Sequence, residues 1–390
     1  MAMNGGCCEA VKEMTFLDFF SGIGGFRRGF ELCGMVCKGH CEIDRHADRS
    51  YRAMFDVKED EWYRDDITKV QPGELPRVNL WCGGFPCQDV SISGRHRGLA
   101  GERSGLFFEM VRLLKGTPAQ SRPEWLVFEN VRNLLSIHQG WDFAAVLCSL
   151  AGLGYHIEYG LLNSKLHGVP QNRERVYLVA YRHFRAGGRR KVFPVECGDC
   201  KALIELIGGT QGSRVYDAQG ISCTLTANGG GYGGKTGLYF VDLSKGNPRL
   251  TETARCLTAR YDGSVTNRRG EHSGVFTGCD MPDEEMGGMQ GSRLISCTNG
   301  SRILQTGNEP PQRCGRIRRL TPRECWRLQG FPDAMFKRAA AVNSDSQLYK
   351  QAGNSVTVPV VYAVGQRIIA IQGELDKEGE DAAWRKSFKQ

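Results

Sequence analysis

The residue best suited to covalent chemistry in this chain is a cysteine that follows a short apolar run and two glycines. Residues 78–82 have the pattern of a buried strand, Gly83 and Gly84 permit a tight turn, and Pro86 fixes the backbone just before Cys87. A thiol at the carboxyl end of a strand is a candidate nucleophile, because open α/β sheets place active sites there. The alternative is that Cys87, like most of the 16 cysteines, fills the core.

A carboxylate and two guanidinium groups form a second candidate set. Glu129 follows the apolar run 125–128, where a buried carboxylate is costly unless it has a partner or a role. Arg173 and Arg175 precede another apolar run, 176–181, and side chains two residues apart in a strand point to the same side. We expect the two arginines to hold Glu129 and a substrate through forked hydrogen bonds.

The first apolar run, 15–20, leads into a glycine-rich turn and then a helical stretch that Gly34 closes, an order typical of nucleotide-binding units. Arg27 stands where the dinucleotide fingerprint needs its third glycine, which argues against a nicotinamide dehydrogenase. Glu42 lies twenty residues after Gly22, the spacing at which an acid meets ribose hydroxyls, and Asp66 could accept from an adenine amino group. For each acid the alternative is a helix N-cap or a solvated loop charge.

Two stretches have the composition of a surface that binds phosphates. Residues 88–105 are rich in glycine, serine and arginine and suggest a mobile lid beside Cys87, or else an ordinary exposed loop. Residues 255–269 carry four arginines around Tyr261, as a DNA-facing surface would. Short near-repeats, such as 209–214 and 288–293, suggest more than one recognition element or merely recurrent turns.

Composition sets the class of protein. The 390 residues are 41% hydrophobic and 24% charged with a net charge of +8, which is ordinary for a soluble chain and permits a nucleic-acid partner. No apolar run approaches the ~18 residues that span a membrane, and the N-terminus lacks a secretory signal. We therefore expect a cytoplasmic or nuclear protein with reduced thiols. Cys197 and Cys200 lack a second ligand pair nearby, so we expect no metal.

The patterning predicts three segments: a catalytic and cofactor-binding domain at 1–182, a loop- and strand-rich domain at 183–315, and a return to the first domain at 316–390. Thr321, Pro322 and Glu324 have the spacing of a helix start. An amphipathic helix is expected at 358–371 and should pack on the first domain, while the charged tail after Gly373 should fray.

These motifs, in this order, resemble the DNA (cytosine-5) methyltransferases. The resemblance covers nearly the whole chain outside 183–315, where that family carries its variable target-recognition domain. It rests on FLDFFSGIGGFRRGFELCG (16–34), Glu42, DDIT (65–68), GGFPCQ (83–88) with SISG (91–94), FENV (128–131), QNRERVYLV (171–179), RRLTPRECWRLQGFP (318–332) and QAGNSV (351–356).

The resemblance implies an α/β fold, a doubly wound Rossmann-like sheet that binds S-adenosylmethionine and releases S-adenosylhomocysteine, and a smaller target-recognition domain. It implies a flipped cytosine, attack by Cys87 on C6, and charge stabilisation by Glu129 with Arg173 and Arg175. The cofactor residues that it implies are Phe20, Gly22, Gly24, Glu42, Asp66, Pro86, Leu106, Asn354, Ser355 and Val356. The expected DNA contacts are Gln88, Ser91, Ser93, Arg95, Arg97, Arg255 and Arg260.

The partners implied are double-stranded DNA and, in a restriction–modification system, a cognate endonuclease, with no membrane. The enzyme is expected to be a monomer, bacterial or phage-encoded, in the cytoplasm beside the nucleoid. Two related readings differ from this one. A tRNA-acting relative would carry a Cys-Phe-Thr segment, which is absent, and a silent DNA-binding relative would lack Cys87, Glu129 or the arginine pair.

Overall fold

A computed structural model of the chain shows two sheets and eight α-helices in the parts that it describes. The described residues are 13–85, 105–182, 191–195, 205–207, 215–217, 222, 224–225, 238–242, 292–296, 302–306, 313–318 and 320–387.

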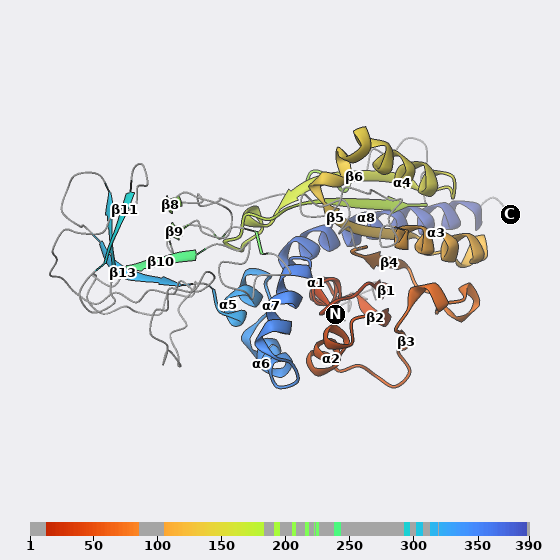
Figure 1. The fold of residues 1–390 in the computed structure, drawn as a ribbon. Coiled ribbons are helices and arrows are strands. Elements are labelled where there is room, and N and C mark those ends of the chain that lie inside the picture. Colours follow the sequence, from red (N-terminus) through yellow and green to blue (C-terminus); the bar gives the residue numbers. More distant parts are fainter. Residues whose placement is uncertain are drawn as a thin grey trace, which may run out of the picture.

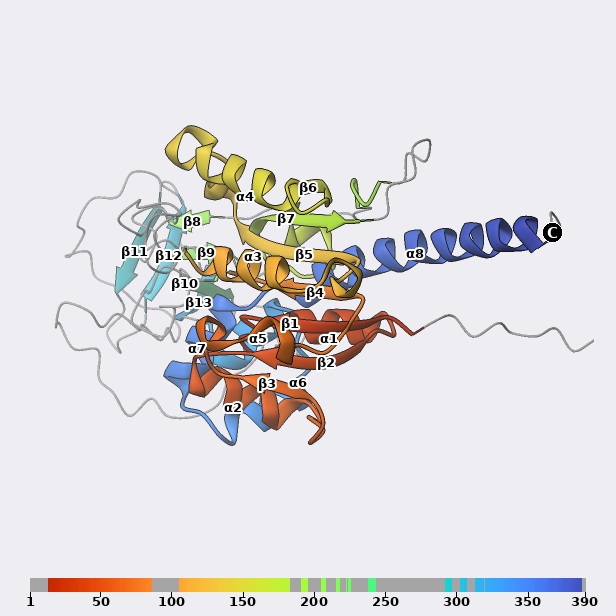
Figure 2. The ribbon, with the colours of Figure 1, turned by 90° about the vertical axis from the view of Figure 1, so that its right-hand side faces the viewer.

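The larger sheet has seven strands in the order β3-β2-β1-β4-β5-β7-β6, and Figure 2 shows them in this order from bottom to top. The strands are β1 (Thr15–Phe19), β2 (Val36–Cys41), β3 (Trp62–Arg64), β4 (Leu80–Gly83), β5 (Trp125–Val131), β6 (His156–Asn163) and β7 (Glu174–Tyr181). Strands β1 to β5 pair in parallel, whereas β7 runs antiparallel to both β5 and β6. The expected doubly wound α/β fold is confirmed.

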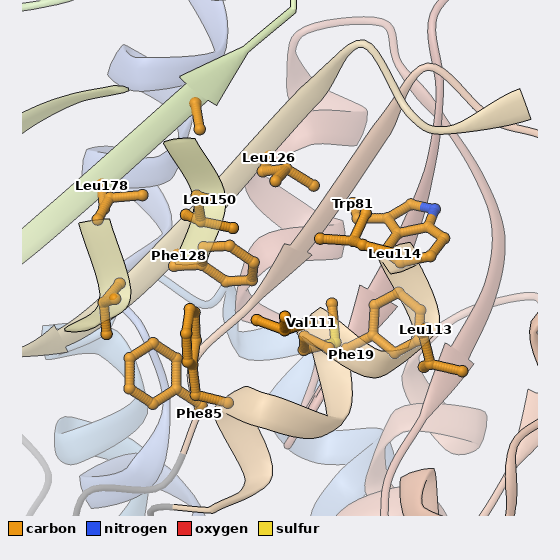
Figure 3. Close-up of a cluster of buried hydrophobic side chains, with 14 of the residues drawn as sticks. Phe19, Trp81, Phe85, Val111, Leu113, Leu114, Leu126, Phe128, Leu150 and Leu178 are labelled. Carbon is orange, nitrogen blue, oxygen red and sulfur yellow. The ribbon is translucent and has the colours of Figure 1, made fainter. Parts of the chain in front are cut away.

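Alternation along β5 explains why helices cover both faces of this sheet. Trp125 and Val127 belong to one buried cluster, and Leu126 and Phe128 belong to another. The Leu126 side is covered by α3 (Leu106–Gly116) and α4 (Trp141–Ala151), and Figure 3 shows that cluster around Phe85 and Trp81. On the Trp125 side lie α1 (Gly25–Leu32) and α8 (Val358–Ser387).

The C-terminal part of the chain returns to the first strands as predicted. A Cβ at Gly29 of α1 would lie 2.5 Å from Val361 of α8, so the two helices approach closely. The helices α2 (Arg45–Met54), α5 (Pro322–Leu328), α6 (Asp333–Ala340) and α7 (Asp345–Asn354) share a third buried cluster around Trp326. The predicted cap of α5 is confirmed, because Thr321 Oγ1 accepts from the Glu324 amide and Glu324 Oε2 accepts from the Thr321 amide.

One expectation about the tail is wrong. We expected the chain to fray after Gly373, but α8 continues to Ser387 and extends past the sheet in Figure 2. Residues 374–387 are rich in Glu, Lys and Ala, which favour helix, and Gln372 Nε2 donates to Asp376 Oδ1 at 2.8 Å, one turn ahead.

One described helical span, Asp345–Lys377, is long and apolar enough to cross a membrane by length and composition alone. Half of its most apolar window is buried, and Val361, Val364 and Ile368 pack in the cluster beneath α1. A core helix passes the same test, so this span is weak evidence for a membrane.

The second sheet has six strands in the order β11-β12-β13-β10-β9-β8 and lies to one side of the larger sheet in Figure 1. The strands are β8 (Glu205–Ile207), β9 (Val215–Asp217), β10 (Leu238–Asp242), β11 (Ser292–Ser296), β12 (Arg302–Thr306) and β13 (Arg313–Arg318). All are three to six residues long, as the composition of 183–315 suggested.

A buried carboxyl lies in the centre of the larger sheet. Asp18 of β1 is fully buried opposite Cys82 of β4, whose Sγ lies 3.7 Å from Asp18 Oδ1. Asp18 Oδ2 has no hydrogen-bond partner among the described residues. Burial raises the pKa of Asp18 well above its usual value, and the backbone N–H and the charge of Arg27 oppose that shift only in part. The raised pKa favours the protonated form of the Asp18 carboxyl in the folded chain.

This assignment predicts how Asp18→Asn changes stability with pH. A raised folded-state pKa means that wild type loses stability as pH rises above the unfolded value near ~4, by up to about 1.4 kcal/mol per pH unit. The side-chain amide of the variant does not titrate, so its free energy of unfolding relative to wild type should increase from pH 5.5 to pH 8. Urea unfolding at both pH values would measure this difference. An equal deficit of the variant at both pH values would mean instead that Asp18 is an ionised partner of Arg27.

Candidate active site

Three residues of the turn after β1 have left-handed backbone conformations. Phe20, Gly22 and Gly24 have φ values of 52°, 55° and 79°. A Cβ at Gly24 would lie 2.4 Å from the ring of Phe55, so glycine is required there for both space and conformation. The next residue, Gly25, has Ser355 Oγ and Val356 Cγ2 within 2.9 Å of the place where its Cβ would be. The turn therefore lies directly against the segment that follows α7.

Glu42, at the end of β2, is fixed to this turn through its carboxylate. Glu42 Oε2 accepts from the Gly22 amide at 2.6 Å, and Oε1 accepts from the Asp44 amide at 2.7 Å. Burial raises the pKa of Glu42, while those two amide hydrogen bonds oppose the shift. The neighbouring Ile43 is 71% exposed, which is unusual for a large apolar side chain beside a polar site. Sequence reasoning missed Ile43, since its exposure cannot be read from its type.

Asp66 takes the helix-cap role that the sequence left open. Its Oδ1 accepts from the Thr68 amide at 3.0 Å and from Thr68 Oγ1 at 2.7 Å, and Lys69 Nζ lies 3.4 Å from Oδ2. These hydrogen bonds from Thr68 lower the pKa of Asp66. The side chain is half-buried, so a cap does not prevent it from meeting a ligand, and its adenine contact stays a prediction.

The remaining described cofactor candidates come from α3 and from the end of α7. Leu106 is the first residue of α3 and is half-buried against the Figure 3 cluster. Asn354 is exposed, whereas Ser355 and Val356 are buried. Ser355 and Val356 contact the glycine turn as described above, so the structure brings these distant segments together.

The end of β4 passes between the glycine turn and β5. A Cβ at Gly83 would lie 2.7 Å from Phe19 O, and one at Gly84 would lie 3.4 Å from Glu129 Oε2 and 3.8 Å from Val356 Cγ1. Phe85 then packs between Phe107 and Phe128, with ring centroids 5.2 and 6.1 Å away (Figure 3). The chain that leads to Cys87 therefore leaves the sheet directly beside Glu129.

Glu129 lies at the carboxyl end of β5 and is 9% exposed. Arg175 Nε lies 3.1 Å from Glu129 Oε1 and forms an ion pair with it, although this oxygen has no hydrogen bond of good geometry. An acceptor that is buried and has no aligned donor is open to another hydrogen-bond partner. The pair thus presents an oriented carboxylate beside the start of the Cys87 segment.

Arg173 makes different contacts from those expected. It is 3% exposed and donates through Nη1 to Leu225 O and through Nη2 to Gly353 O and Ser355 O, at 3.0 to 3.2 Å. Within the described residues only Arg175 of the two arginines pairs with Glu129. The alternation argument does not reach Arg173, because β7 begins one residue later, at Glu174. Burial and the charge of Arg175 lower the pKa of Arg173.

Asn130 is a site residue that sequence reasoning did not single out. It is 3% exposed, and its Nδ2 donates to Phe85 O at 3.2 Å, just before the segment that carries Cys87. Its Oδ1 accepts from the Val131 amide at 2.8 Å. The only signal in the sequence was that this polar residue stands between Glu129 and Val131, the apolar last residue of β5. We infer that Asn130 fixes the carbonyl from which the Cys87 segment departs.

Asn130→Asp tests this anchor, because it keeps the shape and the acceptor but removes the Nδ2–H donor. We expect kcat for the methyl transfer that the resemblance implies to fall about tenfold or more, since misplaced catalytic groups lose proximity. Single-turnover transfer of a tritiated methyl group would measure it. Asn343→Asp, which removes a half-buried donor to His46 O and Ser50 Oγ on α2, is the matched control and should keep the wild-type rate. Equal rates in wild type, Asn130→Asp and Asn343→Asp would contradict this role of Asn130.

Several predicted residues fall outside the described part of the chain, so their roles stay predictions. They are Pro86, Cys87, Gln88, Ser91, Ser93, Arg95, Arg97, Cys197, Cys200, Arg255 and Arg260. Among the residues that are described, no group of three or more His, Cys, Asp or Glu side chains is placed to hold a metal ion.

Comparisons with known proteins identify the family of this chain. The model of the C-5 cytosine-specific DNA methylase family matches residues 14–198 and 247–370, and the gap at 199–246 lies inside the predicted recognition segment. The orphan methyltransferase M.Rho11sI of Bacillus phage rho11s is 28% identical, over 92% of this chain and 98% of its own length. The type II methyltransferase M.HhaI of Haemophilus parahaemolyticus is 27% identical, over 92% and 95% respectively.

The fold is shared with solved structures. That of the Entamoeba histolytica methyltransferase EhMeth superposes with a TM-score of 0.61 at 15% identity, covering 93% of this chain and 99% of the other. The family model covers most of the chain, including the glycine turn, Glu129 and the arginine pair. The chain therefore belongs to the C-5 cytosine-specific DNA methylase family and is a DNA (cytosine-5) methyltransferase.

Proposed function

We propose that this enzyme methylates C5 of a cytosine rotated out of duplex DNA, through a transient bond between Cys87 Sγ and C6. The observation that carries the proposal is the Glu129–Arg175 pair, which lies beside Gly84 where the chain departs toward Cys87. A base with a ring acceptor and an exocyclic amine needs an oriented carboxylate, and a nucleophile within a few ångströms of it.

The residues around the glycine turn fit S-adenosylmethionine. Glu42 has a free lone pair on each oxygen for ribose hydroxyls, since each oxygen accepts one amide hydrogen bond. The exposed Ile43 offers an apolar surface for a purine ring, and Asp66 would accept from its amino group. Phe20, Gly22, Gly24, Pro86, Leu106, Asn354, Ser355 and Val356 would form the remaining walls. The bound cofactor supplies an electrophilic methyl group on sulfur.

Cys87 would make C5 reactive. Addition of its thiolate to C6 places electron density on C5, a poor nucleophile in the intact ring, so that C5 accepts the methyl group. A base or water then removes the C5 proton, and the returning electron pair expels Cys87 as the thiolate. The nucleophile is regenerated, and the ring regains its C5–C6 double bond.

Glu129 would bind the pyrimidine edge that changes charge during this addition. As C6 is attacked, negative charge develops on the ring and N3 becomes more basic, so a proton shared between the Glu129 carboxyl and N3 would neutralise that charge, while the other carboxyl oxygen accepts from the exocyclic amine. Arg175 holds the Glu129 carboxylate in place at 3.1 Å. Both groups belong to neighbouring strands, β5 and β7, which makes the arrangement rigid.

The second sheet would supply target recognition. We propose that 183–315 is a DNA-reading domain whose sheet is β8–β13, with β13 crossing the predicted boundary at 315, and that residues 88–105 close over the flipped base. Flipping costs a few kcal/mol, which contacts from Gln88, Ser91, Ser93, Arg95, Arg97, Arg255 and Arg260 would offset. Bisulfite sequencing of DNA from cells that express the enzyme would identify the methylated motif.

Relatives bear the names of both type II and orphan methyltransferases. We propose that this enzyme acts beside a restriction endonuclease that recognises the same DNA sequence. Expression in a host should make the host DNA resistant to endonucleases that cut the bisulfite-mapped motif.

A mechanism trap tests the proposed chemistry. Fluorine at C5 cannot leave as a proton does, so 5-fluorocytosine in duplex DNA should hold the enzyme in a denaturation-resistant adduct when the cofactor is present. Adduct formation on duplex DNA but not on 5-fluorocytosine-substituted tRNA supports the proposal. An adduct on tRNA alone would favour the hypothesis that the enzyme methylates tRNA. Absence of any adduct would favour the hypothesis that the protein binds DNA without catalysis.

A further inference from the structure

A buried polar junction joins three parts of the chain that lie far apart in sequence. Its centre is the segment Pro170–Arg173, which lies between η7 (Ser164–Leu166) and β7. Gln171 is fully buried, and Arg173 is 3% exposed. Neither residue touches Glu129 through a hydrogen bond or an ion pair among the described residues, so the mechanism above does not use them directly.

One side of the junction holds Ser222 and Leu225, inside the predicted recognition domain. Gln171 and Ser222 form a parallel bridge, the Asn172 amide donates to Ser222 O at 2.7 Å, and the Leu225 amide donates to Gln171 Oε1 at 3.1 Å. Arg173 Nη1 adds a bond to Leu225 O. The recognition segment is therefore attached to the catalytic region by side chains as well as by backbone pairing.

The other side holds the end of α5 and the wall after α7. Gln171 Nε2 donates to Leu328 O at 2.9 Å, so one amide group spans from the recognition segment to α5. Arg173 Nη2 donates to Gly353 O and Ser355 O, and Ser355 lies against Gly25 of the cofactor turn. Figure 1 shows α5 and α7 on the side of the larger body that faces the second sheet.

The physics of this junction makes it sensitive to displacement. Buried hydrogen-bond donors and acceptors need partners. If a buried guanidinium loses one of its carbonyl acceptors, an N–H of a charged group is left without a partner, which costs free energy. A shift of Ser355 would therefore disturb Arg173, and through Arg173 and Gln171 it would disturb Leu225. Ordering of the cofactor wall and placement of the recognition segment should favour each other.

We propose that Gln171 and Arg173 are positioning residues that couple cofactor binding to DNA binding. The proposal rests on the proposed function, because it requires that S-adenosylmethionine occupies the wall at 353–356 and that 183–315 reads DNA. In wild type, S-adenosylhomocysteine should bind at least about fivefold more tightly when duplex carrying the bisulfite-mapped motif is saturating. Calorimetry with and without that duplex measures the factor.

Two variants test the residues. Gln171→Met keeps the size of the side chain but removes both hydrogen-bonding groups, and Arg173→Lys keeps the charge but cannot reach three carbonyls. Both should bring the coupling factor close to one. Gln351→Met is the matched control: Gln351 is also a buried glutamine, but it bonds Ser50 Oγ and His46 O on α2, so its loss should leave the factor unchanged.

Hydrogen exchange gives a readout that needs neither DNA nor a variant. S-adenosylhomocysteine alone should slow exchange of the Leu225 amide in wild type, together with the amides at 353–356. Protection at 353–356 without protection at Leu225 would overturn the coupling, as would a wild-type coupling factor in Gln171→Met or Arg173→Lys. Failure of wild type to bind S-adenosylhomocysteine at all would instead overturn the proposed function.

Discussion

Cys87→Ser should abolish the 5-fluorocytosine adduct and lower methyl transfer by more than about 1,000-fold, since removal of a nucleophile costs most of the chemical acceleration. A serine hydroxyl has a far higher pKa than a thiol and is not ionised without a strong base beside it. Affinity for duplex DNA should stay close to that of wild type, because phosphate and base contacts come from other residues. Gel analysis of the adduct and single-turnover transfer measure the two effects.

The other cysteines that the structure describes are less suited than Cys87 to act as a nucleophile. Burial raises the pKa of Cys37 and Cys41 to about 12, and it raises the pKa of Cys82 well above its usual value. These thiols stay protonated at neutral pH and serve as core residues. Cys148 is exposed on α4, away from β4 and β5 in sequence, so Cys148→Ser is the matched control and should form the adduct normally. An adduct that survives in Cys87→Ser would refute the mechanism.

Local patterns made much of the fold predictable. The turn after β1, the capping box at Thr321 and the apolar run of β5 depend on residues within a few positions of one another. These features recur wherever the same spacing occurs, so they could be identified before any tertiary contact was known. The return of α8 to the first domain followed from its amphipathic pattern, although its contact with α1 and its length did not.

The contacts of the site residues were less predictable. Arg173 bonds carbonyls that lie 52, 180 and 182 positions away in sequence, and nothing in its neighbours specifies them. Asn130 holds Phe85 from 45 positions away, and Ile43 is 71% exposed although its residue type favours burial. Long-range partners depend on strand order and register, which a single sequence does not encode locally.

Glu129→Gln should lower the rate of methyl transfer by about 100- to 1,000-fold, the range found when a preorganised charge stabiliser is removed. Glutamine keeps the size of the side chain but lacks the carboxyl group that pairs with Arg175 and that would share a proton with N3 of the cytosine. Because Glu129 would act while C6 is attacked, formation of the 5-fluorocytosine adduct should slow by the same factor. Rapid-quench measurement of adduct formation tests this directly.

The matched control for that variant is Glu174→Gln on the adjoining strand. Glu174 Oε2 pairs with Arg132 Nη1 at 2.8 Å, but that pair is largely exposed, and exposed pairs contribute about 0–1 kcal/mol. Its loss should change neither the adduct rate nor S-adenosylhomocysteine affinity. In Glu129→Gln the affinity for S-adenosylhomocysteine should also persist, because the proposed cofactor residues lie on other segments, chiefly the turn after β1, the end of β2 and the end of α7. If Glu129→Gln formed the adduct at the wild-type rate, the carboxylate would be a structural partner of Arg175 and another group would have to bind the cytosine.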